Sequence, residues 1–216
     1  MAGCCNSRGC DRMFNQRFAQ RMARRYGKRG LDKTAQQMVR DLSAHGIQGA
    51  SVLEIGGGLG EIHVELLKRG AAHATNLELS TAYDLEAQRL LQDTGFDQRV
   101  DRQILDIAVK PEDVESADVV VLHRVICCYP DYVTLLSAVA THARQQVAFS
   151  YPARNVGSRL FIALQNLVFR LQGSEFRVFA HRPAAMFAVL ADHGFTPASL
   201  HRRPIWRVAA FTRLPV

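Results

Sequence analysis

A glycine-rich stretch after a short apolar run constrains this chain more than any other part of its sequence. The run from Val52 to Ile55 predicts a buried strand, and an amphipathic run begins at Glu61. Glycines between them permit the unusual φ values of a tight turn and let a ligand contact the bare backbone. A strand, a glycine turn and a helix start predict a loop that binds a nucleotide-like cofactor. The alternating glycines are Gly56, Gly58 and Gly60.

Strand and helix patterns alternate through most of the chain. Strands separated by helices predict right-handed βαβ units, and hence an α/β fold with a mostly parallel sheet and helices on both faces. The 216 residues, nearly half of them apolar, suffice for one such domain with a full core. The expected strands are 52–55, 72–77, 99–105, 118–122 and 146–149, and the expected helices are 61–70, 82–93, 132–142, 155–171 and 182–193. The last β-rich runs, 198–203 and 206–212, predict an antiparallel hairpin at a sheet edge.

The N-terminal segment is strongly basic. The formal net charge is +7, and the eight Arg and Lys residues before residue 31 are opposed only by Asp11. An irregular arm is expected first, then a basic amphipathic helix from Asp11 to the glycines near residue 30, and a second helix with Asp32 as N-cap. The predicted parts are an arm and helical lid at 1–46 and a domain at 47–216, with a helical insertion at about 154–180.

The basic segment is compatible with nucleic acid, an acidic membrane surface, an anionic substrate, or simply water around a helix. Nucleic acid is disfavoured because few aromatic residues accompany the charges and no recognition module follows them. Peripheral membrane contact stays open, although no run of about 20 apolar residues predicts a membrane-spanning helix. Met1 to Cys10 lacks the apolar core of a signal peptide, so a cytoplasmic location is expected.

Two acidic residues accompany the glycine turn at the expected spacing. Glu78 stands 22 residues after Gly56, at the end of the second predicted strand. A carboxylate at that place accepts hydrogen bonds from ribose hydroxyls. Asp106 ends the third strand in the same way, where its carboxylate could meet an adenine amino group. The alternative is that both are ordinary loop acids.

Together these residues resemble the class I S-adenosylmethionine-dependent methyltransferases. The resemblance implies a Rossmann-like sheet of seven strands with an antiparallel last strand, S-adenosylmethionine as cofactor and S-adenosylhomocysteine as product. In that family the glycine loop contacts the methionine part of the cofactor. A dinucleotide enzyme is the competing interpretation, but the G-x-G-x-G spacing here lacks the final x-x-G. The cofactor residues that the resemblance implies are Glu54, Gly56, Gly57, Gly58, Gly60, Glu78, Leu79, Asp106, Ile107 and His123.

A narrower resemblance, to the magnesium-protoporphyrin O-methyltransferases, runs along most of the chain. That family has a catalytic tyrosine in its N-terminal lid, which Tyr26 matches, and a catalytic histidine just before Tyr-Pro. Cys127 and Cys128 precede Tyr129 here, so the second residue is missing. The matching motifs are Arg25-Tyr26-Gly27, Thr34-Ala35-Gln36-Gln37, Tyr129-Pro130, Ser150-Tyr151-Pro152-Ala153 and Phe176-Arg177, followed by His181.

His123 is a candidate base, because it ends the fourth predicted strand at the edge where open α/β sheets bind ligands. A structural histidine near the core is the alternative. A carboxylate acceptor needs no base, because its oxygen is already nucleophilic and requires only alignment with the methyl group. The sequence therefore predicts O-methylation, with Tyr26 and His123 as catalytic candidates.

The expected acceptor is a small hydrophobic anion, such as a carboxylate, a porphyrin-like molecule or a natural product. The helix predicted at 155–171 is apolar on one side and has arginines at its edge, and guanidinium groups pair bidentately with carboxylates. A core-facing helix with a polar outer face is the alternative. The candidate acceptor residues are Tyr129, Arg154, Arg159 and Arg177.

The cysteines leave other functions open. Without an export signal they should be reduced thiols or metal ligands. Adjacent cysteines do not have the usual zinc spacing, and packing is the simpler interpretation for Cys127 and Cys128. Metalloid or thiol methylation and a non-catalytic protein that holds a metal remain alternatives. Their metal ligands would be Cys4, Cys5, Cys10, Cys127 and Cys128.

Overall fold

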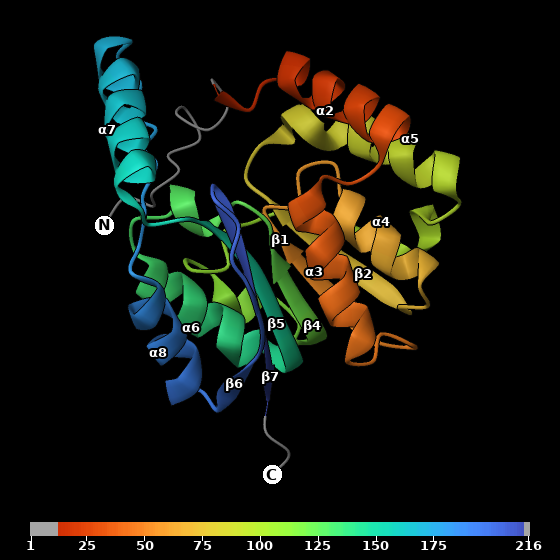
Figure 1. Cartoon of the computed structure of the whole chain (residues 1–216). Coiled ribbons are helices and arrows are strands. Elements are labelled where there is room, and N and C mark those ends of the chain that lie inside the picture. Colours follow the sequence, from red (N-terminus) through yellow and green to blue (C-terminus); the bar gives the residue numbers. More distant parts are fainter. Residues whose placement is uncertain (1–12, 214–216) are drawn as a thin grey trace.

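The computed structural model describes residues 13–213, which contain a seven-stranded sheet in the order β3-β2-β1-β4-β5-β7-β6 (Figure 1). The first five strands are parallel, and β7 pairs antiparallel with both β5 and β6. This confirms the predicted α/β class and the antiparallel hairpin at the edge. The strands are β1 Ser51–Ile55, β2 His73–Glu78, β3 Val100–Ile104, β4 Ala117–Leu122, β5 Ala143–Pro152, β6 Phe195–His201 and β7 Trp206–Arg213.

Helices cover both faces of the sheet, as predicted. The central strand β4 is buried on both faces because Val119 and Val121 face one cluster while Val120 and Leu122 face the other. The first cluster includes side chains of α3 and α4, and the second includes side chains of α6 and α8. The helices are α2 Gln16–Arg29, α3 Lys33–Ala44, α4 Glu61–Lys68, α5 Asp84–Thr94, α6 Tyr132–His142, α7 Val156–Leu171 and α8 Pro183–Asp192.

Most predicted elements appear with end shifts of a few residues, and the larger differences have local causes. The basic amphipathic helix is α2, which begins after Asn15, because the Asn15 side chain accepts from the Phe18 N–H and caps it. The predicted start at Asp11 lies outside the described residues. Strand β5 is longer than expected, since β4 and β7 pair along its two sides. Strand β6 starts three residues early and contains Pro197, which an edge strand tolerates at the irregularity there.

The two helices of the predicted lid pack differently. Helix α3 buries Met38, Val39 and Leu42 against the sheet and belongs to the core. Helix α2 instead contacts α5 and the 3₁₀ turn before it, at the carboxyl end of the parallel strands. Of the two, α2 is therefore the one that covers that end. The domain division at residue 46 stays a prediction.

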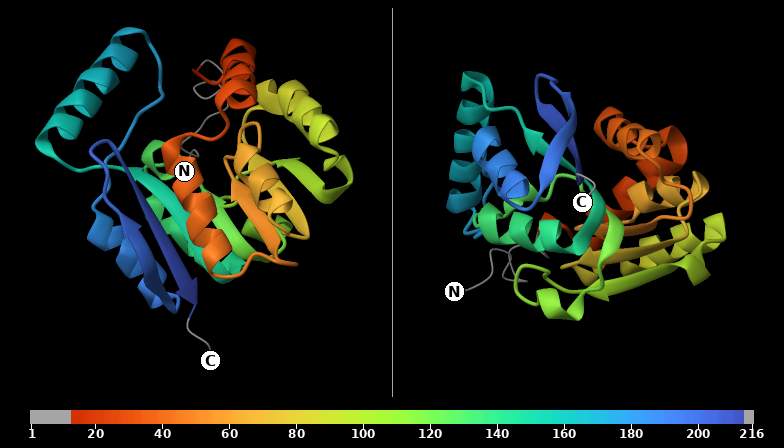
Figure 2. Two further views of the ribbon diagram at one scale, coloured as in Figure 1. Left: turned by 45° about the vertical axis from the view of Figure 1, so that its right-hand side comes forward. Right: turned by 90° about the horizontal axis from the view of Figure 1, so that it is seen from below.

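Helix α7 lies outside the helix–sheet–helix layers. Figure 2 shows it standing away from the body, at the same end of the molecule as α2. Its apolar side faces outward, with Leu160 71% and Leu164 58% exposed, and only Phe169 of this helix is buried. The apolar side of α7 therefore neither faces the core nor lines the cavity. No helix within residues 13–213 combines the length and apolarity needed to cross a bilayer.

Candidate functional site

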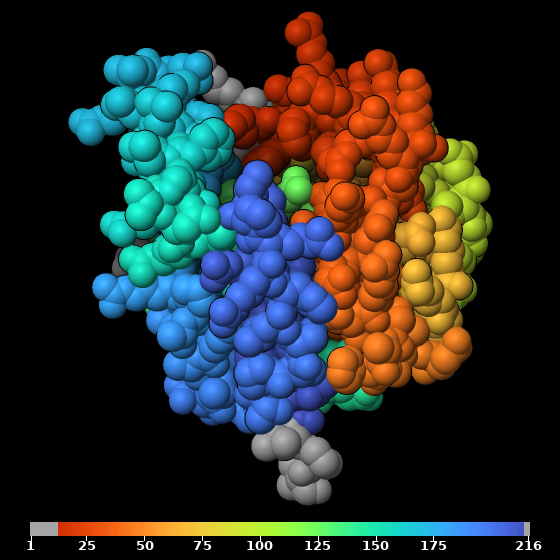
Figure 3. Space-filling view, in the orientation of Figure 1, coloured from red at the N-terminus to blue at the C-terminus, as the bar shows by residue number. Residues whose placement is uncertain are grey.

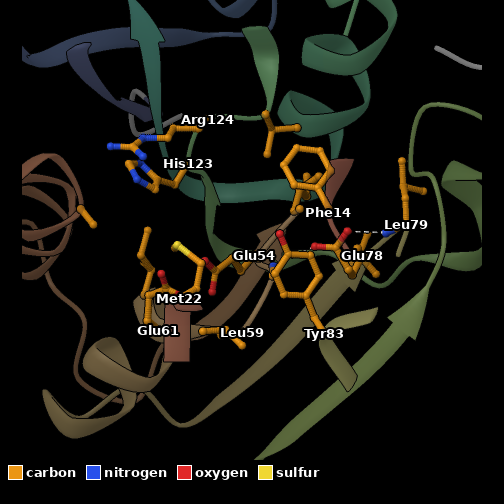
Figure 4. Close-up of a pocket in the computed structure, with 18 of the residues that line it drawn as sticks. Phe14, Met22, Glu54, Leu59, Glu61, Glu78, Leu79, Tyr83, His123 and Arg124 are labelled. Carbon is orange, nitrogen blue, oxygen red and sulfur yellow. Dashed lines mark hydrogen bonds between the residues drawn. The ribbon is translucent and has the colours of Figure 1, made fainter. Parts of the chain in front are cut away.

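A cavity lies at the carboxyl end of the parallel strands and is covered in part by α2. Figure 4 shows His123 and Arg124 on one side of it and Glu78 and Leu79 on the other, with Glu54 between them. Most of the predicted cofactor residues border this cavity. They are Glu54, Gly56, Gly57, Gly58, Glu78, Leu79, Asp106, Ile107 and His123.

The glycine turn needs glycine for steric as well as conformational reasons. A Cβ at Gly57 would come within 2.5 Å of the Asn76 side-chain oxygen, and one at Gly56 within 2.5 Å of Val125. Gly60 has φ +88°, and the His63 ring occupies the space that a Cβ there would need, so glycine lets the chain enter α4. Gly60 itself does not border the cavity. Side chains thus pack so closely against Gly56 and Gly57 that these positions have no room for a Cβ, and both border the cavity.

Glu54 supplies the cap that Gly60 lacks. Its buried Oε2 accepts from the His63 backbone N–H at 3.0 Å and from His63 Nδ1 at 2.7 Å. The first-turn N–H groups of a helix need an outside acceptor, and the glycine at the N-cap has no side chain to provide one. Glu54 therefore fixes the start of α4 to the end of β1. Sequence analysis missed His63, for which no motif was evident.

Glu78 connects two loops of the site. Its Oε2 accepts from the Gly58 N–H at 2.8 Å, and its Oε1 accepts from Leu79 N–H at 2.7 Å and Ser80 N–H at 3.2 Å. Three N–H groups converge on this one carboxylate, and Glu78 as a whole is only 9% exposed. The glycine turn is thus held against the end of β2.

Arg102 of β3 holds the turn from the other side. Its Nη1 donates to the Gly58 carbonyl at 2.8 Å and its Nε donates to Asp84 at 2.8 Å. Gly58 is therefore bonded through both its N–H and its C=O. Nothing in the sequence linked Arg102 to the turn, because the two become neighbours only through the pairing of β2 with β3.

Asp106 follows β3 and lies beside an aromatic residue from the next crossover. Its carboxylate accepts from the Tyr129 hydroxyl at 3.1 Å and from the Ala108 N–H at 3.0 Å. Ile107 is 1% exposed and packs in the core. The segment after β3 and the segment after β4 therefore meet at the cavity wall, which both Asp106 and Tyr129 border.

A polar cluster joins the end of β4 to the start of α3. Asp32 caps α3 through the Thr34 and Ala35 N–H groups, and its Oδ2 also receives Arg124 at 2.7 Å and lies 3.5 Å from His123 Nε2. His123 Nδ1 is 3.0 Å from the Ser150 hydroxyl. Burial acts to raise the pKa of Asp32, but the hydrogen bond and charge of His123, the Ala35 N–H and Arg124 hold it well below its usual range.

Replacing Asp32 by Asn should make the free energy of unfolding less dependent on pH in the acid range. A lowered folded-state pKa gives stability that is present above the unfolded value, near 3.8, and is lost as the pH falls below it. Asn keeps the cap, so Asp32→Asn isolates the charge and should lower the free energy of unfolding by about 1 kcal/mol at neutral pH. Urea titrations from about pH 3 to 7 would measure this, and a constant difference across that range would contradict it.

Tyr26 borders the cavity but its hydroxyl is engaged. It donates to Glu65 Oε1 at 2.7 Å, and burial together with that carboxylate raises the pKa of Tyr26 above its ordinary value. In this arrangement Tyr26 retains its proton and can position a ligand with its ring.

Glu61 borders the cavity as well, a position that sequence analysis missed although it directly follows Gly60. Burial, and then the charge of Glu54, raises the pKa of Glu61 to about 7. The cavity therefore holds a carboxyl group whose charge state responds to nearby cations. Five carboxyl side chains border the cavity, those of Asp32, Glu54, Glu61, Glu78 and Asp106.

Comparison with known protein families gives one match, to the Methyltransferase domain, over residues 53–149. The matched segment begins in β1 and ends in β5, so it contains the glycine turn, Glu78 and Asp106. This match, which covers somewhat less than half of the chain, makes residues 53–149 similar to a methyltransferase domain. No curated protein sequence matches the chain.

Solved structures of methyltransferases share the fold of this chain at low sequence identity. The magnesium protoporphyrin IX methyltransferase of Synechocystis, with bound S-adenosylhomocysteine, matches with a TM-score of 0.72 and 21% identity over 93% of this chain and 96% of that one. A TehB-like S-adenosylmethionine-dependent methyltransferase from Corynebacterium glutamicum matches with 0.64 and 17% identity over 92% and 97%. An O-methyltransferase family 2 protein from Planctomyces limnophilus, in complex with apigenin, matches with 0.69 and 16% over 91% and 62%.

Three arginines predicted to bind the acceptor lie away from the cavity. Arg154 and Arg159 are exposed beside and on α7, and the Arg177 guanidinium donates to the carbonyls of Ser174 and Phe176. Among the described residues that border the cavity, the guanidinium groups belong instead to Arg25 and Arg124. The fourth acceptor candidate, Tyr129, does border it.

Two of the five cysteines can be placed. Cys127 is 3% exposed, its Sγ lies 3.5 Å from that of Cys128, and Cys128 borders the cavity. No cluster of three or more metal-ligating side chains occurs between residues 13 and 213. Cys4, Cys5 and Cys10 lie outside the described residues.

Proposed function

We propose that this chain transfers a methyl group from S-adenosylmethionine to a small, hydrophobic and anionic acceptor, at an oxygen atom. The observation that carries the proposal is the convergence on one cavity of the glycine turn, Glu78 and Asp106, all in the segment similar to a methyltransferase domain. Neighbouring structures with S-adenosylmethionine or S-adenosylhomocysteine bound support the choice of cofactor.

The residues present fit that cofactor. Glycines border the cavity at positions where a Cβ would collide with neighbouring side chains, and carboxylates stand at or just after the ends of β2 and β3. S-adenosylmethionine carries a positively charged sulfonium group, which supplies the methyl group to a nucleophile. The five carboxyl groups of the cavity wall provide a negative environment for that charge. On this proposal Glu78 would bind the ribose and Asp106 the adenine.

The anionic acceptor is inferred from the opposite wall. Arg25 and Arg124 border the cavity on the side of α2 and the β4 end, where their side chains are 41% and 39% exposed. Arg124 is the one non-glycine residue with positive φ among those described, at 61°, and its guanidinium donates to Asp32. A carboxylate held by these guanidinium groups would need only alignment, whereas a hydroxyl acceptor could give its proton to His123. Tyr26 and Tyr129 would pack against the acceptor.

A second candidate function rests on the adjacent thiols. Since Cys128 borders the cavity with Cys127 beside it, a soft metalloid or a thiol is an alternative acceptor, and a metal-holding protein with the same pocket is another. Replacing both cysteines by serine separates these functions from the first. Methyl transfer to a carboxylate should survive Cys127→Ser with Cys128→Ser, whereas thiol-dependent transfer or metal retention should be lost.

The cofactor assignment is tested by calorimetric titration with S-adenosylmethionine. Glu78→Ala should weaken binding about tenfold, or ~1.4 kcal/mol, because ribose loses its acceptor and the glycine turn loses its anchor. Glu115→Ala is the matched control, since Glu115 is exposed and does not border the cavity. Equal affinity of Glu78→Ala and wild type, or no binding by the wild type, would contradict the assignment.

Oxygen as the acceptor atom needs a separate assay. Transfer of a labelled methyl group to aromatic carboxylic acids should exceed transfer to the matching amides, which lack the charge that Arg25 and Arg124 would bind. Equal transfer to acid and amide would refute the anionic acceptor, while leaving the cofactor assignment intact.

A further inference from the structure

Helix α7 presents a continuous apolar face to solvent. At 100° per residue its exposed apolar side chains occupy one broad arc, and both ends of the helix contribute, Val156 being 83% and Leu171 78% exposed. Large apolar surfaces of this kind mark sites of interaction. The arc consists of Val156, Leu160, Phe161, Leu164, Leu167, Val168 and Leu171.

The outward orientation of this arc is fixed by contacts on the opposite side of α7. The Asn166 side chain donates to the Val178 carbonyl and accepts from the Val178 N–H, both at 2.8 Å. Phe169 packs edge-on against Phe176 with ring centroids 5.5 Å apart. Rotating α7 by half a turn about its own axis would expose Phe169 and break both hydrogen bonds of Asn166. The polar and aromatic side is thus the one that holds α7 to the body.

Cations lie at one edge of the apolar arc and on the neighbouring elements. Arg159 and Arg170 lie along one edge of α7, and neither α2 nor α7 contains Asp or Glu. The tip of the β6–β7 hairpin adjoins the start of α7, where Asn155 donates to the Pro204 carbonyl, and it exposes Ile205 at 69%. The exposed cations of these elements are Arg17, Arg21, Arg24, Arg25, Lys28, Arg29, Arg154, Arg159, Arg170, Arg202 and Arg203.

These elements share one end of the molecule. Figures 1 and 2 show α7, α2 and the tip of the hairpin at the carboxyl end of the parallel strands. In Figure 3 the same helices stand on either side of that end. The cavity also lies at this end, under α2. One surface therefore combines an apolar helix, an apolar hairpin tip, many cations and the cavity.

We propose that α7 and the hairpin tip dock the chain on an anionic lipid surface. A helix that lies in the membrane interface buries an apolar face below the headgroups and keeps cations at its edges near anionic lipids. The arc of α7 with Arg159 and Arg170 at its edge has that pattern, and the cations of α2 add long-range attraction. Docking would bring the cavity next to lipid, from which a hydrophobic acceptor could enter. The inference does not depend on methyl transfer.

Charge argues against a second copy of the chain as the occupant. A symmetric dimer through α7 would bring the same arc of both chains together, along with both pairs of Arg159 and Arg170. No acidic residue in α2 or α7 could pair with them. An anionic bilayer instead satisfies the apolar and the cationic parts of the surface at once.

Flotation of the full chain with lipid vesicles tests the proposal, without cofactor or acceptor. The chain should bind vesicles of phosphatidylcholine with about 30% phosphatidylglycerol, bind pure phosphatidylcholine at least about tenfold less, and dissociate in part in about 1 M salt. Leu167→Glu should reduce binding about tenfold or more, because a carboxylate would enter the apolar layer. Arg159→Glu with Arg170→Glu should reduce binding to the anionic vesicles only.

Ile104→Glu is the matched control, because Ile104 is 51% exposed against 50% for Leu167 and lies on β3, at the opposite edge of the sheet from β6. It should bind like wild type, and the milder Leu167→Ser should lie between wild type and Leu167→Glu. Equal binding of Leu167→Glu and wild type would overturn the proposal. Dimers in sedimentation that Leu167→Glu dissociates, with no vesicle binding by the wild type, would assign α7 to a second copy instead.

Discussion

Glu54→Ala should lower the free energy of unfolding by about 3–5 kcal/mol. The Glu54 carboxylate is 2% exposed and is the acceptor for both the backbone N–H and Nδ1 of His63, which is 1% exposed. Without it, two buried donors lose their partner and α4 loses the cap that Gly60 does not supply. The loss is large compared with the roughly 5–15 kcal/mol of a typical domain.

Urea denaturation followed by circular dichroism measures this effect. Glu54→Gln should lose about half as much as Glu54→Ala, because its amide oxygen can still accept one His63 hydrogen bond. Glu112→Ala is the control for removing a glutamate, since Glu112 is exposed in the 3₁₀ turn Pro111–Asp113. A loss below about 1 kcal/mol for Glu54→Ala would show that the cap of α4 is supplied elsewhere.

Glu61→Gln should make the chain more stable above neutral pH, by about 3 kcal/mol. Burial and the charge of Glu54 raise the pKa of Glu61 from 4.5 to about 7. A raised folded-state pKa gives stability that is fully present below the unfolded value and is lost as the pH rises through the folded value. Glutamine cannot ionise, so the variant should match wild type near pH 4.5 and exceed it progressively up to about pH 8.

Thermal or urea unfolding at several pH values between about 4.5 and 8 checks the sign as well as the size. Glu115→Gln is the control, because Glu115 is exposed and away from the cavity. Parallel curves for Glu61→Gln and wild type would mean that Glu61 titrates alike in both states. A cationic ligand in the cavity should favour the ionised form of Glu61, so S-adenosylmethionine should bind more weakly to wild type below about pH 6.

The two carboxyl groups that govern these stabilities also belong to the candidate site. Glu54 and Glu61 flank the glycine turn, one before it and one after it, and both border the cavity. The site therefore keeps a carboxyl group that lowers stability when it ionises, next to one that fixes α4. Such a group is consistent with a site shaped for a positively charged ligand rather than for stability alone.

Local patterns in the sequence were sufficient for the fold. Glycine turns, helix caps such as Asp32 and the alternation of strand and helix periods depend on neighbours in the chain, so they can be recognised without tertiary contacts. The positions of Glu78 and Asp106 were predictable for the same reason, because Glu78 ends β2 and Asp106 lies two residues after β3, and the sequence itself marks both strand ends.

The sequence by itself thus determined the α/β class, the glycine turn and the acids at the strand ends. Only the tertiary structure showed which distant groups meet them: His63 under Gly60, Arg102 against the Gly58 carbonyl, and Arg124 on Asp32. It also turned the apolar side of α7 outward, where an amphipathic pattern alone suits a core face equally well. The physical reason is common to all: strand pairing, burial and the direction of a helix face are set by partners far away in sequence.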